Sequence, residues 1–215
     1  MLENVPLFAG LSRDELLAVS RVAVKKSYPK HTIVINAGDT TDSVYIINSG
    51  KVKVLIGDDT GREIILAMLG QGEFFGEMSL IDDQPRSATV VTMETSEFTI
   101  ISKGDFNQCL LNNPPITTHI LQGLARRLRE ADKKIESLAL LDVYGRVART
   151  LLQLADKDNG NMVVKEKLSQ KDIANMIGAS REMVSRILKD LVIGGYVKMD
   201  GKRITLMKEK LPRCW

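Results

Sequence analysis

Cysteine and histidine are scarce in this chain, which has two of each among its 215 residues. Cys109 and Cys214 lie far apart and lack CxxC spacing, so they cannot supply the ligands, about four, of an iron–sulfur cluster. His31 and His119 form no pattern typical of haem ligation. We therefore expect two reduced thiols, and no iron–sulfur cluster, haem or metal cofactor.

Long apolar runs are also missing. No stretch of about 18 apolar residues exists, so no transmembrane helix is expected. Residues 1–17 show no basic segment followed by an apolar one, so we expect no secretory signal, no membrane partner and a cytoplasmic location. Hydrophobic residues make up 44% and charged residues 27% of the chain, as in globular proteins, and the length fits two modest domains.

Signatures of catalysis are absent from the sequence as well. It has no P-loop pattern, GxxxxGK followed by Ser or Thr, and no pair of carboxylates set around a magnesium ion. It also shows no cluster of metal ligands and no activated nucleophile. We therefore expect a protein that is not an enzyme.

The charge of the chain is small overall, +3, but unevenly spread. Residues 141–215 hold 15 Lys+Arg against 9 Asp+Glu, whereas residues 1–140 hold 15 against 18. A basic C-terminal third beside a mildly acidic remainder indicates nucleic acid as a partner.

The period of the hydrophobic pattern changes along the chain. Residues 1–30 indicate short helical turns, with Ser12 and Glu15 placed as a capping box. Residues 31–102 contain the β-rich runs TIVINAG, SVYIINSGKVKVLI, REIILAML, SATVVTM and SEFTIIS, with turn signals such as NSGK and GDDTG. Because no helix of about 10–15 residues separates these runs, an antiparallel sandwich or barrel is favoured over a parallel sheet.

From about Pro115 the pattern becomes helical, and its apolar positions alternate steps of four and three. These positions, called the seam, are Thr117, Leu121, Leu124, Leu128, Ala131, Ile135 and Leu138. Such a pattern, kept over three repeats among charged neighbours, favours a coiled-coil dimerisation helix. The alternative is a helix that packs only on its own domain.

The last third of the chain predicts a winged helix. DVYGRVARTLLQLADK has the pattern of an amphipathic helix. Ser169 caps the next helix, with Asp172 in the capping-box position. Gly178 breaks that helix and Ser180 caps another, which makes a helix-turn-helix. YVKMDGKRITL then predicts a β-hairpin that turns at its DG pair.

The second helix of a helix-turn-helix enters the major groove, and its first turns contact base edges. The residues assigned to DNA here are Ser180, Arg181, Glu182, Ser185 and Arg186. Arginine can donate two hydrogen bonds to guanine, and glutamate can accept one from cytosine. The face expected to pack on the first helix is Met183, Val184, Ile187, Leu188 and Leu191. At the start of the first helix, where amides are free to bind DNA phosphate, the assigned residues are Ser169, Gln170 and Lys171. A solvated helix with a Glu–Arg pair is the alternative.

FFGEMSLIDDQPRSATV, residues 74–90 and called the cassette below, sets one glutamate and one arginine among apolar residues. Glu77 and Arg86 could form a buried salt bridge. They could instead hold a ribose-phosphate, since Arg86 and Ser87 can donate to phosphate and Glu77 can accept from a ribose hydroxyl. Gly76 lacks a Cβ, so backbone amides could approach such a ligand closely, and the helical turn MSLI follows it.

The stretch FGEMSLIDDQPRSATV resembles the phosphate-binding cassette of cyclic-nucleotide-binding domains, and TDSVYIINSGKVKV resembles the strands before it. LALLDVYGRVARTLL and GASREMVSRILKDL resemble the hinge segment and recognition helix of the cyclic-AMP receptor protein and fumarate-nitrate regulator (CRP/FNR) family. The likeness covers about residues 5–208. It implies an α+β fold with an N-terminal antiparallel β-roll that binds a cyclic nucleotide (1–114), a long dimerisation helix (115–140) and a C-terminal winged helix-turn-helix (141–215).

The resemblance also implies roles for single residues. Glu77 would accept from the ribose 2′-hydroxyl, Gly76 would donate from its backbone, and Arg86 would bind the cyclic phosphate. The ligand-binding set is Gly76, Glu77, Met78, Arg86, Ser87, Arg127, Ala131 and Asp132. The residues that would read a DNA half-site are Arg181, Glu182 and Arg186.

Cyclic AMP is the effector that the resemblance implies. Members of the family that respond to cyclic AMP present a threonine-serine pair to the adenine, where this chain has Ala131 and Asp132. A carboxylate can accept from the N1 and N2 donors of guanine, so cyclic GMP or cyclic di-GMP is an alternative. Asp132 could also be a surface charge paired with Arg129 or Lys133, and a DNA-binding dimer that needs no ligand stays open.

The same resemblance implies the partners and the mechanism. The partners are a second copy of the chain, palindromic double-stranded DNA and RNA polymerase. Nucleotide binding would bias a hinge near Leu141–Asp142 and so the orientation of the two recognition helices. In a dimer these helices would lie about one turn of DNA apart.

Overall fold

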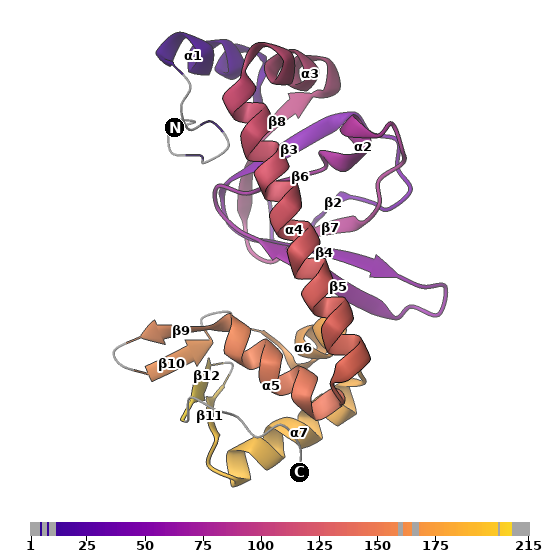
Figure 1. Cartoon of the computed structure of the whole chain (residues 1–215), viewed down its shortest axis with the longest axis vertical. Helices are drawn as coiled ribbons and strands as arrows, with labels where there is room; N and C mark the ends of the chain where they lie inside the picture. Colours follow the sequence, from indigo (N-terminus) through magenta and orange to yellow (C-terminus); the bar gives the residue numbers. More distant parts are fainter. Residues whose placement is uncertain are drawn as a thin grey trace. The chain divides into compact units, whose positions relative to one another are not determined.

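The structure is a computed structural model that describes residues 5, 8, 12–158, 161–164, 168–201 and 203–207 (Figure 1). Cys214 lies outside these ranges. The chain divides into two compact units, residues 1–129 and 130–215. Within the described ranges, no helix is long and apolar enough to cross a membrane.

The first unit is built on two four-stranded sheets. Their strands are β1 (Val24–Tyr28), β2 (Ile33–Ile35), β3 (Ser43–Ser49), β4 (Val52–Gly57), β5 (Glu63–Leu69), β6 (Phe74–Phe75), β7 (Thr89–Thr92) and β8 (Ser96–Ser102). One sheet has the order β1-β8-β3-β6 and the other the order β2-β7-β4-β5. Every pairing in them is antiparallel, which confirms the predicted β-rich domain.

Two apolar cores cover opposite faces of the β1-β8-β3-β6 sheet, because successive residues of a strand point to opposite faces. Phe75 joins the core between the two sheets, with Ile35, Ile47, Val52, Leu69, Val90 and Phe98. Phe74 joins the core on the other face, with residues that include Val44, Ile46, Leu80, Phe106, Ile116 and Ile120. The two phenylalanines thus anchor the start of the cassette in both cores.

Helices cover the second of these cores. They are α1 (Arg13–Val22), α2 (Met78–Ile81), α3 (Lys103–Asn112) and the first part of α4 (Pro114–Leu140). The predicted capping box of α1 is present, with Ser12 Oγ accepting from the backbone N–H of Glu15 at 3.3 Å. α1 and α3 lie side by side at one end of the unit (Figure 1).

Some elements of this unit differ from the sequence prediction or were not predicted. Residues 24–28 form β1, paired with β8, although residues 1–30 were expected to be helical turns. α3 was not predicted, and it carries a single buried side chain, Phe106, so its apolar period is weak. The NSGK turn carries the chain from one sheet to the other, whereas GDDTG closes a hairpin between β4 and β5.

The helix α4 is continuous over 27 residues and has two apolar faces. Ile116, Ile120 and Gly123 are buried in the first unit. The seam residues Leu121, Leu128 and Ile135 are 61%, 65% and 64% exposed. Leu124, also of the seam, is half-buried against that core. The helix therefore packs on its own domain through one face, while most of the seam stays exposed.

The second unit contains α5 (Val143–Leu154), α6 (Gln170–Ile177), α7 (Arg181–Ile193) and the strands β9 (Ala155–Asp158), β10 (Asn161–Val164), β11 (Val197–Asp200) and β12 (Arg203–Leu206). Its sheet has the order β11-β12-β10-β9. Gly178 ends α6 with φ +65°, a left-handed conformation suited to glycine, and Ser180 caps α7. The predicted winged helix-turn-helix is confirmed.

Two boundaries in this unit differ from the sequence prediction. The helix expected over DVYGRVARTLLQLADK ends at Leu154, because the next residues form β9 and pair with β10. Asp200 pairs with Arg203 across the wing hairpin, so its turn begins at Gly201, one residue later than expected.

Candidate functional site

The cassette joins β6 to β7 through the single helical turn α2, as the sequence predicted. Gly76 follows β6 with φ +84°, and Glu77 stands at the N-cap of α2. A Cβ at position 76 would lie 2.8 Å from Arg86 Nη1 and 3.0 Å from the carbonyl oxygen of Ser43. Both the backbone angle and this close approach require glycine there.

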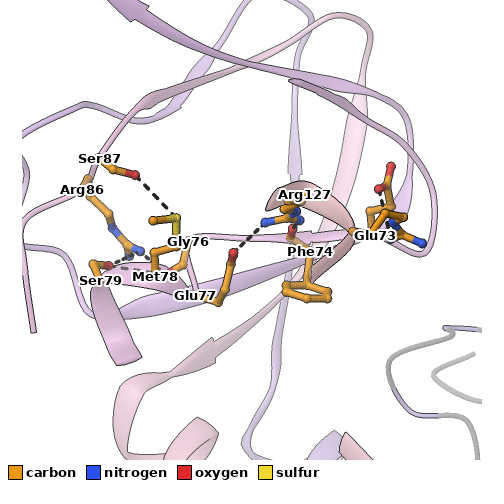
Figure 2. Close-up of polar contacts among 10 residues, drawn as sticks. Glu73, Phe74, Gly76, Glu77, Met78, Ser79, Arg86, Ser87 and Arg127 are labelled. Atoms are coloured by element: carbon orange, nitrogen blue, oxygen red, sulfur yellow. Dashed lines mark hydrogen bonds and ion pairs between the residues drawn. The ribbon is translucent and has the colours of Figure 1, made fainter. Parts of the chain in front are cut away.

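Arg86 is buried, at 4% exposure, among acceptors from separate parts of the chain. Its Nε donates to Thr41 Oγ1 at 3.0 Å, and its Nη2 donates to the Ser43 carbonyl oxygen at 2.6 Å. Its Nη1 donates to the carbonyl oxygen of Gly76 and, at 2.8 Å, to Ser79 Oγ (Figure 2). These acceptors are uncharged, so they orient the guanidinium without neutralising it.

Burial and nearby acidic groups act on the Arg86 guanidinium in opposite directions. Burial is the main cause that lowers the pKa of its guanidinium. The groups that oppose this fall in pKa are Tyr45, Asp42, Glu77 and Asp39. An arginine nevertheless stays protonated in proteins, so the cassette holds a permanent, largely desolvated cation.

Glu77 is buried at 1% exposure and is paired by the structure with Arg127 of α4 instead of with Arg86. Arg127 Nη1 donates to Glu77 Oε1 at 2.6 Å, and Nη2 donates to the carbonyl oxygen of Phe74 (Figure 2). The Arg127 guanidinium also lies 4.9 Å from the centre of the Phe74 ring. The buried salt bridge that the sequence left open thus exists with a different cation.

Gly123 lies one helical turn before Arg127 and contacts the same aromatic ring. A Cβ at position 123 would lie 3.0 Å from Phe74 Cζ. The small residue lets α4 approach β6 closely enough for Arg127 to reach Glu77. The first unit therefore gathers these predicted ligand residues: Gly76, Glu77, Met78, Arg86, Ser87 and Arg127.

Four of the predicted ligand residues are exposed to solvent: Met78, Ser87, Ala131 and Asp132. Met78 is 49% exposed, and Ser87 Oγ lies 4.0 Å from its sulfur (Figure 2). Ala131 and Asp132 lie on the part of α4 that belongs to the second unit, and both are exposed. Within the described residues, no group of three or more His, Cys, Asp or Glu side chains could hold a metal ion.

Sequence reasoning missed the groups that hold Arg86. Thr41 lies in the loop before β3, and the Ser43 carbonyl belongs to the first residue of that strand. Both are more than 40 residues from Arg86 in sequence, and no spacing rule links them. Ser79 lies within the cassette but was assigned no role. Its hydroxyl in an otherwise apolar turn was the one signal in the sequence that could have identified it.

In the second unit, α7 presents the residues assigned to base contact to solvent. Arg181, Glu182, Ser185 and Arg186 are exposed, while Val184, Ile187, Leu188 and Leu191 are buried. Met183 was expected in the buried set but is 41% exposed. Hydrogen bonds from its own backbone N–H and from Ser180 lower the pKa of Glu182, so its carboxylate is ionised and accepts hydrogen bonds only.

The start of α6 uses its polar residues partly for its own capping. Ser169 Oγ accepts from the backbone N–H of Asp172 at 3.1 Å and donates to the Asp172 carboxylate at 2.6 Å. Ser169 and Gln170 are half-buried, and Lys171 is exposed. The Ser169 hydroxyl is thus occupied within the helix, and Lys171 is the most accessible of the three assigned phosphate contacts.

Comparisons with known proteins cover both units. Residues 25–113 match the family of cyclic nucleotide-binding domains, and residues 145–211 match the Crp-like helix-turn-helix domain. A CRP-like cAMP-activated global transcriptional regulator of Mycobacterium tuberculosis is 32% identical over 218 residues, covering 99% of this chain and 97% of the relative. The cAMP-activated global transcriptional regulator CRP of Pasteurella multocida is 38% identical over 183 residues, covering 83% and 88%.

Solved structures show the same likeness. The c-di-GMP-responsive global regulator CLP of Xanthomonas campestris is 29% identical with a TM-score of 0.79, covering 92% of this chain and 100% of that one. The catabolite activator protein of Thermus thermophilus is 34% identical with a TM-score of 0.56, covering 95% and 94%. The helix-turn-helix domain and these relatives are those of transcription regulators and not of enzymes. The chain therefore belongs to the CRP/FNR family, as a DNA-binding transcription regulator with a cyclic nucleotide-binding domain.

Proposed function

We propose that the chain is a homodimeric, sequence-specific DNA-binding regulator whose affinity for palindromic DNA is controlled by cyclic AMP in the cytoplasm. The observation that carries this proposal is the pairing of chemistries in the cassette. A buried, permanently charged Arg86 suits the single negative charge of a cyclic phosphate. A buried Glu77 carboxylate suits a ribose hydroxyl, which donates to it.

Ligand binding would reach α4 through Glu77. Its carboxylate accepts from Arg127 of that helix, so a ribose hydroxyl that also donates to Glu77 changes the same hydrogen-bonding group. A ligand shifts a conformational equilibrium only as far as it binds one state better than the other. We expect the two states to differ in how firmly Arg127 holds α4 to the cassette.

The dimer is proposed from the exposed residues of the seam. Leu121, Leu128 and Ile135 are seven residues apart and more than half exposed on a continuous helix. A second copy of α4 would bury them in coiled-coil fashion and bring two copies of α7 to a palindromic site. RNA polymerase is the further partner expected of such a regulator.

The test is a gel-shift titration of a palindromic family site with and without cyclic AMP. We expect the nucleotide to increase DNA affinity in the wild type, and Arg86→Ala to remove this dependence while basal DNA binding persists. Identical nucleotide dependence in Arg86→Ala would refute the ligand assignment. Tight binding that ignores every nucleotide would favour a ligand-independent DNA-binding dimer.

A guanine nucleotide is the second candidate effector. It is favoured by the exposed carboxylate of Asp132 on α4, at a position where family members that respond to cyclic AMP present a hydroxyl, and by the likeness to a c-di-GMP-responsive regulator. A thermal-shift panel of cyclic AMP, cyclic GMP and cyclic di-GMP distinguishes the candidates, because a ligand that prefers the native state raises its stability. Loss of guanine-nucleotide stabilisation alone in Asp132→Ala would support this effector.

A further inference from the structure

Two side-chain hydroxyls converge on Arg86 from different segments. Thr41 Oγ1 accepts from Nε at 3.0 Å, and Ser79 Oγ accepts from Nη1 at 2.8 Å. Ser79 Oγ also lies 3.4 Å from the Gly76 carbonyl oxygen, to which it can donate its own proton. That donation leaves the lone pairs of the Ser79 oxygen to accept from the guanidinium, a contact drawn as a dashed line in Figure 2.

We propose that Thr41 and Ser79 are positioning residues that fix the Arg86 guanidinium for one non-bridging oxygen of a cyclic phosphate. This role rests on the proposed nucleotide-binding function of the cassette. Together with the carbonyl groups of Ser43 and Gly76, the two hydroxyls use all but one of the guanidinium N–H groups. Among the described residues, the N–H without an acceptor is on Nη2.

A single oriented N–H has a chemical consequence. A guanidinium free to turn can bind a phosphate through two parallel hydrogen bonds and does not distinguish its oxygens. A guanidinium held at Nε and Nη1 offers Nη2 alone, so it addresses one of the two non-bridging oxygens. The pair Thr41 and Ser79 would therefore set the stereochemical preference of the site as well as part of its affinity.

The proposal separates phosphate recognition from base recognition. Cyclic AMP and cyclic GMP carry the same ribose and cyclic phosphate, so loss of either hydroxyl must weaken both nucleotides by the same factor. We expect Ser79→Ala and Thr41→Val each to raise the Kd for both nucleotides about 10-fold, the usual scale for a lost hydrogen bond to a charged group.

The experiment is calorimetric titration of the full-length protein with cyclic AMP, cyclic GMP and the two diastereomers of cyclic AMP phosphorothioate. In each diastereomer sulfur, a weak acceptor, replaces one non-bridging oxygen. The wild type should prefer one diastereomer, and Ser79→Ala and Thr41→Val should move the ratio of the two Kd values toward one. Ser79→Thr, which keeps the hydroxyl, should restore the preference. Thr40→Val is the matched control, because Thr40 is an exposed neighbouring threonine outside this set of contacts.

The outcomes are distinct. Unchanged Kd values and an unchanged diastereomer ratio in Ser79→Ala and Thr41→Val would overturn the positioning role alone. A lower melting temperature with an unchanged ratio would also overturn it, because the hydroxyls would then only support the fold. A wild type that binds none of these nucleotides would overturn the proposed function, and the positioning role with it.

Discussion

Arg127 and Glu77 join the long helix to the cassette through a hydrogen-bonded ion pair of 2.6 Å. Glu77 is buried at 1% exposure, and the side chain of Arg127 is 25% exposed. Removing one member of such a pair leaves the other as an uncompensated buried charge. The pair therefore supports the structure. It is also the contact through which a ligand bound to Glu77 would affect α4.

We expect Arg127→Ala to lower the free energy of unfolding by about 3–5 kcal/mol, because it leaves the Glu77 carboxylate buried without its cation. Urea denaturation at neutral pH measures this. The matched control is Arg126→Ala on the same helix, whose 3.8 Å pair with Glu73 is largely exposed and should contribute about 0–1 kcal/mol. Combining Arg127→Ala with Glu77→Gln should recover part of the loss. Equal losses of unfolding free energy in Arg127→Ala and Arg126→Ala would contradict the proposal that the buried pair of Arg127 with Glu77 stabilises the fold.

Gly123→Ala tests how closely α4 must approach β6. The added methyl would meet Phe74 Cζ at 3.0 Å and Cε1 at 3.3 Å, inside a packed core. We expect a loss of about 1–3 kcal/mol from overpacking, together with weaker nucleotide binding, because Arg127 sits one turn further along. Gly104→Ala in α3 is the control, since a Cβ there meets nothing within 4 Å and alanine is the better helix former. In thermal unfolding, Gly123→Ala should lower the melting temperature and Gly104→Ala should not.

Local periodicity explains what the sequence could predict. Alternation along a strand and the three-to-four step along a helix are properties of neighbouring residues, so the sandwich strands, α4 and the helix-turn-helix were found. The caps at Ser12, Ser169 and Ser180 are equally local, and all three are present. β1 was not predicted because its residues are mostly exposed and show no alternation of buried and exposed positions. The strand is defined by its pairing with β8.

The site was predicted less completely because its chemistry is long-range. Arg127 and Glu77 are 50 residues apart, and Arg86 is 45 residues from Thr41. No spacing rule links the members of either pair. The sequence therefore identified Glu77 and Arg86 as candidate site residues, but one of its alternatives paired these two with each other. The choice of partner depended on Gly123, whose missing side chain brings α4 against Phe74.

The exposed residues of the seam predict a self-association that one substitution should abolish. Leu128 is 65% exposed at the middle of the seam, and a glutamate there would place like charges across a two-stranded coiled coil. We expect Leu128→Glu to be monomeric by analytical ultracentrifugation and to lose affinity for palindromic DNA. Leu111→Glu on α3 is the matched control, because Leu111 is 77% exposed and lies outside the seam. A Leu128→Glu protein that sediments as a dimer would place the interface elsewhere.

The start of α7 predicts how DNA is read. Arg181 is the first residue of the helix and is exposed, so its guanidinium can donate to the O6 and N7 acceptors of a guanine. We expect Arg181→Ala to lose about 1–3 kcal/mol of specific binding energy and to relax the preference at one base pair of each half-site. Lys189→Ala, at an exposed position in the second half of the same helix, should leave that preference intact. Fluorescence anisotropy with a family site and single-base variants, at fixed salt, gives both quantities. If Arg181→Ala weakened all sequences equally, Arg181 would be a phosphate contact, and base reading would pass to Glu182 and Arg186.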